Sequence, residues 1–378
     1  MTVLLITILT LYVALIGGFA IGFGMVPVFT KKEMPPETKF SVIVAFRNEE
    51  ENLRSLLESI AKLDYPSEFF EVLFVDDASE DGSVAIINNF IKNHLDHARG
   101  AIRILTSERK SESPKKDAIE TAVKQAKYDW IVTTDADCIL PEGWLSTFNA
   151  YIVEKQPDFI AAPVTYIYGS SFLEQFQLLD LLSLQGATIG AFGMNRPFLC
   201  NGANLCFRKG VFREVKGYEG NTDIASGDDI FLMEKILKKN PDSVHYLKSA
   251  AAIVTTRPQA STRALIAQRI RWAAKATRYT NSFSKVTGIL VFAMNSMLIL
   301  SLALCFTGSL AWTFLLSAYA VKLLIDTWLL SMTAVFFRQR KVLPAVLLSS
   351  LVYPFFTMFV AISSFQSGFE WKGRTFKK

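Results

Sequence analysis

The sequence predicts an α/β domain with a mainly parallel sheet, with membrane helices before and after it. Two observations support this fold class. Short apolar runs alternate with helical patterns from Lys39 to about Arg257, which is typical of α/β domains with parallel strands. Hydrophobic residues make up 51% of the 378-residue chain, and the excess lies at the two ends. We therefore expect residues 39–257 to form a globular domain between apolar segments.

The first apolar block, Val3–Phe29, contains no charged residue and exceeds the roughly 20 residues that a helix needs to span a bilayer. A cleaved signal peptide is the alternative. No basic residue precedes the block, however, and the block is longer than the roughly 7–15 apolar residues of a signal peptide. Lys31 and Lys32 follow, and the positive-inside rule then places the next domain in the cytoplasm. We expect residues 1–30 to be an anchor and residues 31–38 to be a linker.

Four apolar runs in the central domain predict strands, and helical patterns separate them. The expected strands are Phe40–Phe46, Phe70–Val75, Ile102–Thr106 and Trp130–Thr134. Three of these strands end at polar residues, which are Arg47-Asn48-Glu49, Asp76-Asp77 and Asp135-Ala136-Asp137. Ligands of such sheets bind beyond the carboxyl ends of the strands, near the point where the strand order reverses. These strand ends therefore predict the functional site.

Asp135 and Asp137 place two carboxylates two residues apart at the end of the fourth strand. Hard oxygen ligands of this kind suit Mg²⁺ or Mn²⁺ bound together with a diphosphate. Such an ion would offset the negative charge that builds on a nucleoside diphosphate as it leaves. A solvated turn is the alternative interpretation.

Asp76 and Asp77 follow the second strand directly. Ser79, Asp81 and Ser83 come next, and all three are good helix-capping residues. Capping does not account for two adjacent acids at the strand end. A carboxylate at this position can accept hydrogen bonds from a base or a ribose.

A second acidic pair, Asp228 and Asp229, opens an apolar helical pattern. Acids in a first helical turn gain from the helix dipole, so a structural role is possible. The competing role is a general base, which would take a proton from an acceptor hydroxyl as its oxygen attacks an anomeric carbon.

Residues 258–285 form a basic segment that contains Gln268, Arg271 and Trp272. From Arg257 to Lys285 there are seven Lys or Arg residues and no Asp or Glu. A helix on an anionic membrane face is one interpretation. In the other, Arg271 binds a diphosphate and Trp272 forms an apolar wall for the sugar or the acceptor. The run is short and leads into an apolar segment, so we expect no nucleic acid partner.

The expected C-terminal membrane region, residues 286–366, contains three apolar blocks. These are Val286–Phe306, Gly308–Phe337 and Val342–Phe365. Arg338, Arg340 and Lys341 mark a cytoplasmic loop. Three spans after a cytoplasmic domain would place the basic tail, residues 367–378, outside the cell. Either one block is re-entrant, or the long middle block is not a simple span.

In this order, and followed by a membrane region, these motifs resemble family-2 glycosyltransferases of GT-A fold over roughly Phe40–Lys275. The likeness is strongest to the membrane-bound branch that includes ceramide glucosyltransferases and the cellulose and hyaluronan synthases. The resemblance implies an inverting enzyme that uses a nucleotide-sugar donor, expected to be a UDP-sugar, with Mg²⁺ or Mn²⁺. The acceptor would be a lipid or a lipid-linked saccharide, at the cytoplasmic face of the cell membrane.

The resemblance also implies roles for individual residues. It implies a nucleotide-sugar site made of Ala45, Arg47, Glu49, Asp76, Asp77, Lys115, Asp135, Gln268, Arg271 and Trp272. The metal would lie on Asp135 and Asp137, and the catalytic base would be Asp229 beside Asp228. The acceptor would meet Asn201, Gly202, Asn204 and Trp272. In that branch Asp228 is usually Glu, and the change shortens the side chain but keeps its charge.

Other functions remain open at this point. A processive polysaccharide synthase shares all of this chemistry, although the membrane region is small for a polymer-secreting channel. A transporter or scaffold with a degenerate domain is suggested by Lys322 and Asp326, four residues apart in an apolar block, unless the two pair with each other. A nucleotidyltransferase would not need the segment from Gln268 to Trp272. The helical pattern Phe172–Ile189 could admit an acceptor from the membrane or pack on the domain core.

Overall fold

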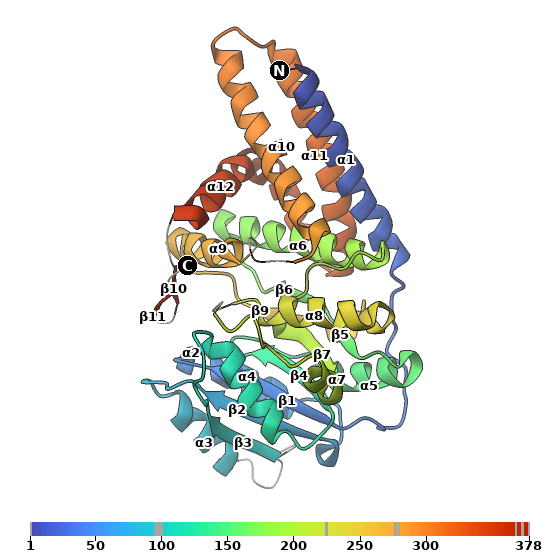
Figure 1. Cartoon of the computed structure of the whole chain (residues 1–378), viewed down its shortest axis with the longest axis vertical. Helices are drawn as coiled ribbons and strands as arrows, with labels where there is room; N and C mark the ends of the chain where they lie inside the picture. The colour runs from blue at the N-terminus through green and yellow to red at the C-terminus, as the bar shows by residue number, and fades with distance from the viewer. Residues whose placement is uncertain are drawn as a thin grey trace.

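The computed structural model describes residues 2–93, 101–223, 226–275, 278, 280–366, 369–371 and 374–376. It has two parts, an α/β domain and a group of long helices that rises from it (Figure 1). The chain starts in the long helices and then builds the α/β domain. It returns to the long helices before it ends beside the domain.

The α/β domain is built on a seven-stranded sheet with the order β3-β2-β1-β4-β7-β5-β8. The strands are β1 (Phe40–Phe46), β2 (Phe70–Asp76), β3 (Ala101–Thr106), β4 (Trp130–Asp135), β5 (Phe159–Ala161), β7 (Leu205–Arg208) and β8 (Val244–Tyr246). The first four are parallel, β7 runs antiparallel to β4 and β5, and β8 is parallel to β5. This confirms the predicted fold class and the four predicted strands. The strand order turns between β1 and β4.

Both faces of the parallel strands are buried, which explains their continuous apolar runs. Phe40, Val42 and Val44 pack on one side of β1, while Ile43 belongs to the cluster on the other side. The shorter helices of the domain are α2 (Glu50–Ala61), α3 (Ser83–Asn93), α4 (Pro114–Gln125), α5 (Trp144–Lys155), α7 (Lys209–Glu214) and α8 (Asp228–Lys239). A two-stranded parallel sheet, β6 (Val164–Tyr166) with β9 (Val254–Thr256), lies between the main sheet and the long helices (Figure 1).

Two helices, α6 (Phe172–Gly193) and α9 (Thr262–Ala274), lie across the boundary between the two parts (Figure 1). A capping box formed by Ser171 and Glu174 starts α6. The expected helix over Phe172–Ile189 is therefore present. It contacts β6 and β8 of the domain and also α1 and α11 of the long helices.

Four helices are long and apolar enough to cross a membrane in the part of the chain that the structure describes. They are α1 (Thr2–Met25), α10 (Ser282–Phe306), α11 (Trp312–Phe336) and the segment Arg340–Phe365, which includes all but the last residue of α12 (Val346–Gln366). Figure 1 shows α1, α10 and α11 rising together, whereas α12 lies oblique to them and its C-terminal end comes down beside α9.

Both ends of α12 lie next to the α/β domain. Before α12, the Nε2 of Gln339 donates hydrogen bonds to Thr165 Oγ1 (2.9 Å) and to the carbonyl of Tyr166 (3.0 Å). After α12, Arg374 Nη1 donates to Asp77 Oδ2 (2.5 Å). Pro354 lies inside α12 and removes one backbone N–H from its hydrogen-bond ladder. The chain therefore enters and leaves α12 on the same side of the long helices.

Helix α1 is packed tightly on α6 through glycines. A methyl group added at Gly22, Gly190 or Gly193 would collide with the backbone of the facing helix. Small residues of this kind let two helix backbones approach closely within a membrane. Lys248 of the α/β domain also donates hydrogen bonds to the carbonyls of Phe23 (2.6 Å) and Val26 (3.1 Å) at the end of α1. The N-terminal helix is thus fixed to the domain along much of its lower half.

Candidate active site

A single cavity of about 1480 Å³ joins the two parts of the molecule. It begins at the carboxyl ends of β1, β2 and β4, where the strand order turns, and continues between α6, α9 and the long helices. Fourteen of the predicted site residues line it, and these are Ala45, Arg47, Glu49, Asp77, Lys115, Asp135, Asp137, Asn201, Gly202, Asp228, Asp229, Gln268, Arg271 and Trp272. Asp76 and Asn204 are not among the lining residues.

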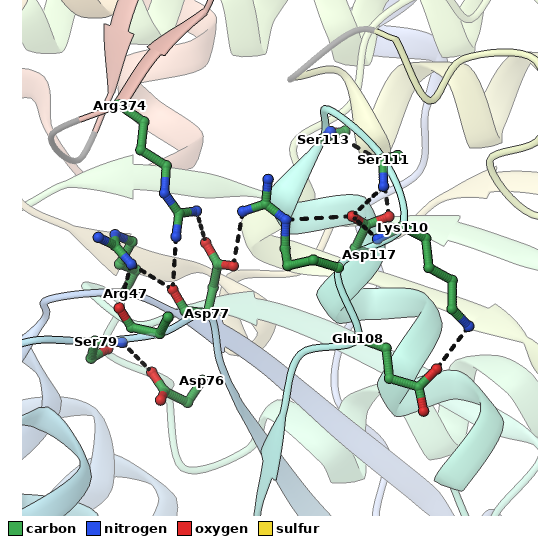
Figure 2. Close-up of polar contacts among 12 residues, drawn as sticks. Arg47, Asp76, Asp77, Ser79, Glu108, Lys110, Ser111, Ser113, Asp117 and Arg374 are labelled. Carbon is green, nitrogen blue, oxygen red and sulfur yellow. Dashed lines mark hydrogen bonds and ion pairs between the residues drawn. The ribbon is translucent and has the colours of Figure 1, made fainter.

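Asp77 is the centre of the polar contacts at one end of the cavity (Figure 2). Its side chain is buried, yet both of its oxygens meet arginines: Oδ1 accepts from Arg109 Nη1 (3.2 Å) and Oδ2 from Arg374 Nη1 (2.5 Å). Arg47 Nη1 donates to the carbonyl of Asp77 (2.8 Å) and its Nη2 to Glu80 Oε1 (2.8 Å). Each carboxylate oxygen of Asp77 is therefore already in contact with one arginine.

Arg109 and Arg374 were not predicted from the sequence. Arg109 lies three residues after β3, at the same edge of the sheet as the predicted strand ends, so its position offered a signal. It is held in place by Asp117, whose Oδ2 lies 3.7 Å from its Nε. Arg374 lies in the segment predicted to be a basic tail, and nothing local indicates that it folds back onto Asp77.

Asp76 does not face the cavity. Its Oδ1 accepts a hydrogen bond from the backbone N–H of Ser79 (2.9 Å), which closes the turn after β2 (Figure 2). β2 ends at Asp76, and the two carboxylates take different partners: that of Asp76 closes the turn, whereas that of Asp77 meets Arg109 and Arg374. We therefore assign Asp76 to the turn, and of this pair Asp77 is the residue that lines the cavity.

Asp135 and Asp137 lie where β4 ends. Burial and the neighbouring carboxylates of Asp135 and Glu49 raise the pKa of Asp137 to about 6. A cation beside these carboxylates would relieve that repulsion, and oxygen ligands suit Mg²⁺ or Mn²⁺. Within the described residues, no group of three or more His, Cys, Asp or Glu could hold a metal. The two acids fit an ion that takes its other ligands from a bound diphosphate.

Lys115 links the two acidic motifs. Its Nζ lies 2.7 Å from Asp135 Oδ1 and 3.4 Å from Asp228 Oδ2. Burial acts to lower the pKa of Lys115, but attraction to these two carboxylates is larger in sum and raises it. Burial likewise acts to raise the pKa of Asp228, but attraction to Lys115, Lys275 and Lys116 lowers it below its ordinary value. Both groups are therefore charged at neutral pH.

Asp229 is held at the start of α8 by two backbone donors and one ion pair. Its Oδ2 accepts from the N–H of Gly202 (3.2 Å), its Oδ1 accepts from the N–H of Ile230 (2.8 Å), and Lys275 Nζ lies 3.6 Å from Oδ1. A methyl group at Gly202 would lie 3.0 Å from Asp228 Oδ2. A larger residue at position 202 would therefore crowd the Asp228 carboxylate.

Asn204 belongs to the scaffold rather than to the cavity wall. Its Oδ1 accepts from Trp144 Nε1 (2.9 Å), and its Nδ2 donates to the carbonyls of Pro163 (2.8 Å) and Ala252 (2.8 Å). The side chain is fully buried, and these bonds use its oxygen and both N–H groups. Asn201 and Gly202 of the same loop do line the cavity.

Helix α9 brings Gln268, Arg271 and Trp272 to the cavity opposite the acids. Burial lowers the pKa of Arg271, and the carboxylates of Asp135, Asp228 and Asp229 act against that change. Arg269 fixes the helix, because its Nε donates to Asp180 Oδ2 of α6 (2.6 Å). Its guanidinium also stacks 4.2 Å from the ring centroid of Trp272.

The acids at the switch point of this sheet face the half-buried Arg271 across the cavity, an arrangement that suits an enzyme that transfers sugars. The chain belongs to glycosyl transferase family group 2, because that family model matches residues 130–361, more than half of its length. The model described as glycosyl transferase family 2 also matches residues 41–215. The protein is therefore a glycosyltransferase.

Two characterised relatives and one solved structure are similar to this chain. A poly(ribitol-phosphate) β-N-acetylglucosaminyltransferase of Staphylococcus aureus is 32% identical over 54% of this chain and 34% of its own length. A poly-β-1,6-N-acetyl-D-glucosamine synthase of Staphylococcus epidermidis is 24% identical over 64% of this chain and 56% of its own length. A mannosyltransferase from Pyrobaculum calidifontis, solved with GDP-Man and Mn²⁺, is 19% identical with a TM-score of 0.59 and covers 92% of this chain and 99% of its own. That structure shares the fold.

Proposed function

We propose that this glycosyltransferase moves a sugar, with inversion, from a nucleotide-sugar to a lipid or a lipid-linked saccharide at the cytoplasmic face of the cell membrane. One observation carries the proposal: a single cavity contains both the acidic motifs of the sheet and apolar residues of α10 and α12. A charged donor can enter from the water side, while an acceptor with hydrocarbon chains can enter from the bilayer.

The donor would bind along the sheet edge. Asp77 can accept hydrogen bonds from the base or ribose once an arginine moves away from it. Lys115 and Arg271 would meet the diphosphate, because both are cations beside Asp135 and Asp228. The solved relative with GDP-Man and Mn²⁺ supports a nucleotide-sugar donor and a divalent ion for this fold.

The reaction would be a single displacement. Asp229 takes the proton of an acceptor hydroxyl, whose oxygen forms a bond to the anomeric carbon as the bond from that carbon to the phosphate oxygen breaks. The nucleoside diphosphate leaves with the electron pair, and Arg271 and Lys115 offset its charge. Mg²⁺ or Mn²⁺ on Asp135 and Asp137 would supply further positive charge there. Attack from the opposite side gives a β-linked product from an α-linked donor.

The membrane arrangement that we propose has three crossings. α1 crosses once, and α10 and α11 cross outward and back. α12 is re-entrant, because Gln339 before it and Arg374 after it both contact the α/β domain. This arrangement keeps the domain and the basic tail in the cytoplasm, as the lysines after α1 also require.

A processive polysaccharide synthase is the second candidate, and the match to the poly-β-1,6-N-acetyl-D-glucosamine synthase favours it. Product length separates the two proposals. Membranes that contain the protein would be incubated with a panel of radiolabelled nucleotide-sugars and then extracted with organic solvent. Label in single-sugar lipids supports the first proposal, whereas label in long water-soluble chains supports the second. Label in neither fraction with any donor would contradict both.

A further inference from the structure

A polar cluster lies inside the membrane-helix part of the cavity. Lys322 Nζ of α11 donates to Asp326 Oδ2 (2.6 Å), and Tyr12 Oη of α1 donates to Asp326 Oδ1 (2.8 Å). Lys322 is 4% exposed and Tyr12 is 5% exposed. The sequence left open whether Lys322 and Asp326 pair with each other, and they do. All three residues line the same cavity as Asp229 and Arg271.

The cluster lies among the long helices, beyond the layer that α6 forms. Lys322 precedes Leu329, which packs beside Gly186 of α6, by a rise of roughly 10 Å at about 1.5 Å per residue. Tyr12 precedes Phe19, which packs beside Gly190 of α6, by roughly 10 Å on the same basis. Both helices therefore place the cluster within the apolar stretches that are long enough to span a membrane. Charged side chains at such depths are costly, and they commonly mark the path of a substrate.

The ammonium of Lys322 has more N–H groups than hydrogen-bond acceptors in the part of the chain that the structure describes. An ammonium has three N–H groups, and in the described part of the chain its one recorded hydrogen-bond acceptor is Asp326. Its other close neighbours are the rings of Tyr12, at 5.2 Å, and Tyr353, at 6.0 Å from the ring centroids. These are contacts with the ring faces, and no hydrogen bond joins Lys322 to either tyrosine hydroxyl within the described residues. A buried lysine in this state can bind one or two oxygen atoms from a ligand in the cavity.

The charge of the cluster limits the class of ligand that it can bind. Asp326 already neutralises Lys322 at 2.6 Å, so a phosphate would have to compete with a bonded carboxylate. Neutral oxygens can accept the remaining N–H groups without that competition. The cavity wall also includes Phe292 of α10 and Val360 of α12, which suit hydrocarbon chains.

We propose that Lys322, held by Asp326 and Tyr12, binds the neutral oxygens of a lipid acceptor in the linkage between its headgroup and its chains. The class comprises ester, amide and hydroxyl oxygens, as in diacylglycerol-type or ceramide-type lipids. The inference rests on the proposed transfer to a lipid. A cluster that only joins α1 to α11 is the competing explanation, and it predicts a loss of stability without a change in lipid binding.

The test uses the full-length protein in phosphatidylcholine vesicles with a diacylglycerol probe that carries a diazirine and an alkyne. Illumination should label α11 or α12 of the unaltered protein. Lys322→Met should reduce that labelling by about five- to ten-fold, the scale of one or two hydrogen bonds. Lys341→Met is the matched control, because Lys341 is exposed and lies outside the cavity lining, and it should label normally. UDP or GDP binding should stay unchanged in both variants.

Lys322→Met leaves Asp326 as an unpaired buried charge, so this variant can lose its fold for that reason alone. The double variant Lys322→Met with Asp326→Leu removes both charges and keeps similar volume. It should fold and still lose the labelling. Normal labelling of the double variant would overturn the inference and leave the cluster as a structural pair.

A second probe identifies the source of the oxygens. An isoprenoid phosphate probe of the same design should label weakly and should be insensitive to Lys322→Met. Strong, Lys322-dependent labelling by the isoprenoid phosphate, with none by diacylglycerol, would also overturn the inference. Failure of the proposed function looks different: diacylglycerol labelling would depend on Lys322, but no nucleotide-sugar would transfer its sugar to any extracted lipid.

Discussion

Replacing Asp229 with asparagine should separate the rate of sugar transfer from donor binding. The carboxylate bonds to the N–H groups of Gly202 and Ile230 and lies near Lys275, and none of these contacts involves Arg47 or Asp77 at the nucleotide end. Loss of a general base costs about 10²–10⁴-fold in turnover, or roughly 3–5 kcal/mol in the barrier. We therefore expect this fall in kcat with little change in the affinity for UDP or GDP.

The structure also predicts how Asp229→Asn changes the folding stability of the protein. An asparagine can keep one oxygen toward Gly202 or Ile230, but its NH₂ group then faces a donor where the carboxylate had an acceptor. A mismatch of this kind costs about 1–3 kcal/mol of folding stability. Size-exclusion profiles and thermal unfolding in detergent should therefore accompany the kinetics. A folded variant with a modestly lower Tm and a rate lost by two or more orders of magnitude fits a base.

Asp228→Asn is the matched comparison, because Asp228 differs from Asp229 in its partner. It lies 3.4 Å from Lys115, which also holds Asp135, so its loss should alter donor binding more than the chemical step. Release of nucleoside diphosphate gives kcat, and calorimetry gives the donor affinity. If Asp228→Asn instead shows the large loss in rate with binding intact, the two roles are exchanged. If Asp229→Asn loses donor affinity as fully as it loses rate, Asp229 belongs to the nucleotide site. A product that retains the anomeric configuration of the donor would reject direct displacement.

Three further outcomes are expected. Activity should require Mn²⁺ or Mg²⁺, and Asp137→Asn should lose most turnover while the protein still folds and inserts; full activity in excess EDTA would rule out the metal. Protease added outside intact cells should leave residues 39–257 uncut, and a tag placed after residue 378 should be protected as well. Cleavage of that tag from outside would mean that α12 crosses the membrane. Arg374→Ala should tighten UDP or GDP binding by up to about five-fold, because a partly exposed ion pair of roughly 1 kcal/mol no longer occupies Asp77. Weaker binding of the variant in calorimetry would instead make Arg374 a nucleotide contact.

The long strands were predictable from the sequence because their own residues carry the signal. β1 and β4 are apolar runs of six or seven residues, which is long enough for a pattern to appear. β5, β6, β8 and β9 have three residues each, and such strands form because neighbours supply their partners. The antiparallel β7 was missed for the same reason.

The site was predictable to the extent that it lies at the strand ends. Asp77 and Asp135 follow from the rule that ligands meet the carboxyl ends of parallel strands. Asp76 was assigned to the site by resemblance, whereas the structure uses its carboxylate to close the turn after β2. Asn204 and Arg374 depend on contacts between segments far apart in the sequence, such as Asn204 with Trp144, and no local pattern reports such contacts.

The glycine contact between α1 and α6 limits which apolar helices could replace α1 in this enzyme. Tyr12, Ile16 and Phe19 of α1 form part of the cavity wall, so the helix that we propose as the membrane anchor is also part of the proposed binding surface. A chain that begins at residue 39 would lose that wall and leave the glycine face of α6 bare. An unrelated apolar helix, with a larger side chain at the position of Gly22, would sit farther from α6 and open the cavity to lipid along its whole length. The anchor is therefore not an interchangeable module, and a transplanted anchor can preserve membrane insertion while it abolishes recognition of the acceptor.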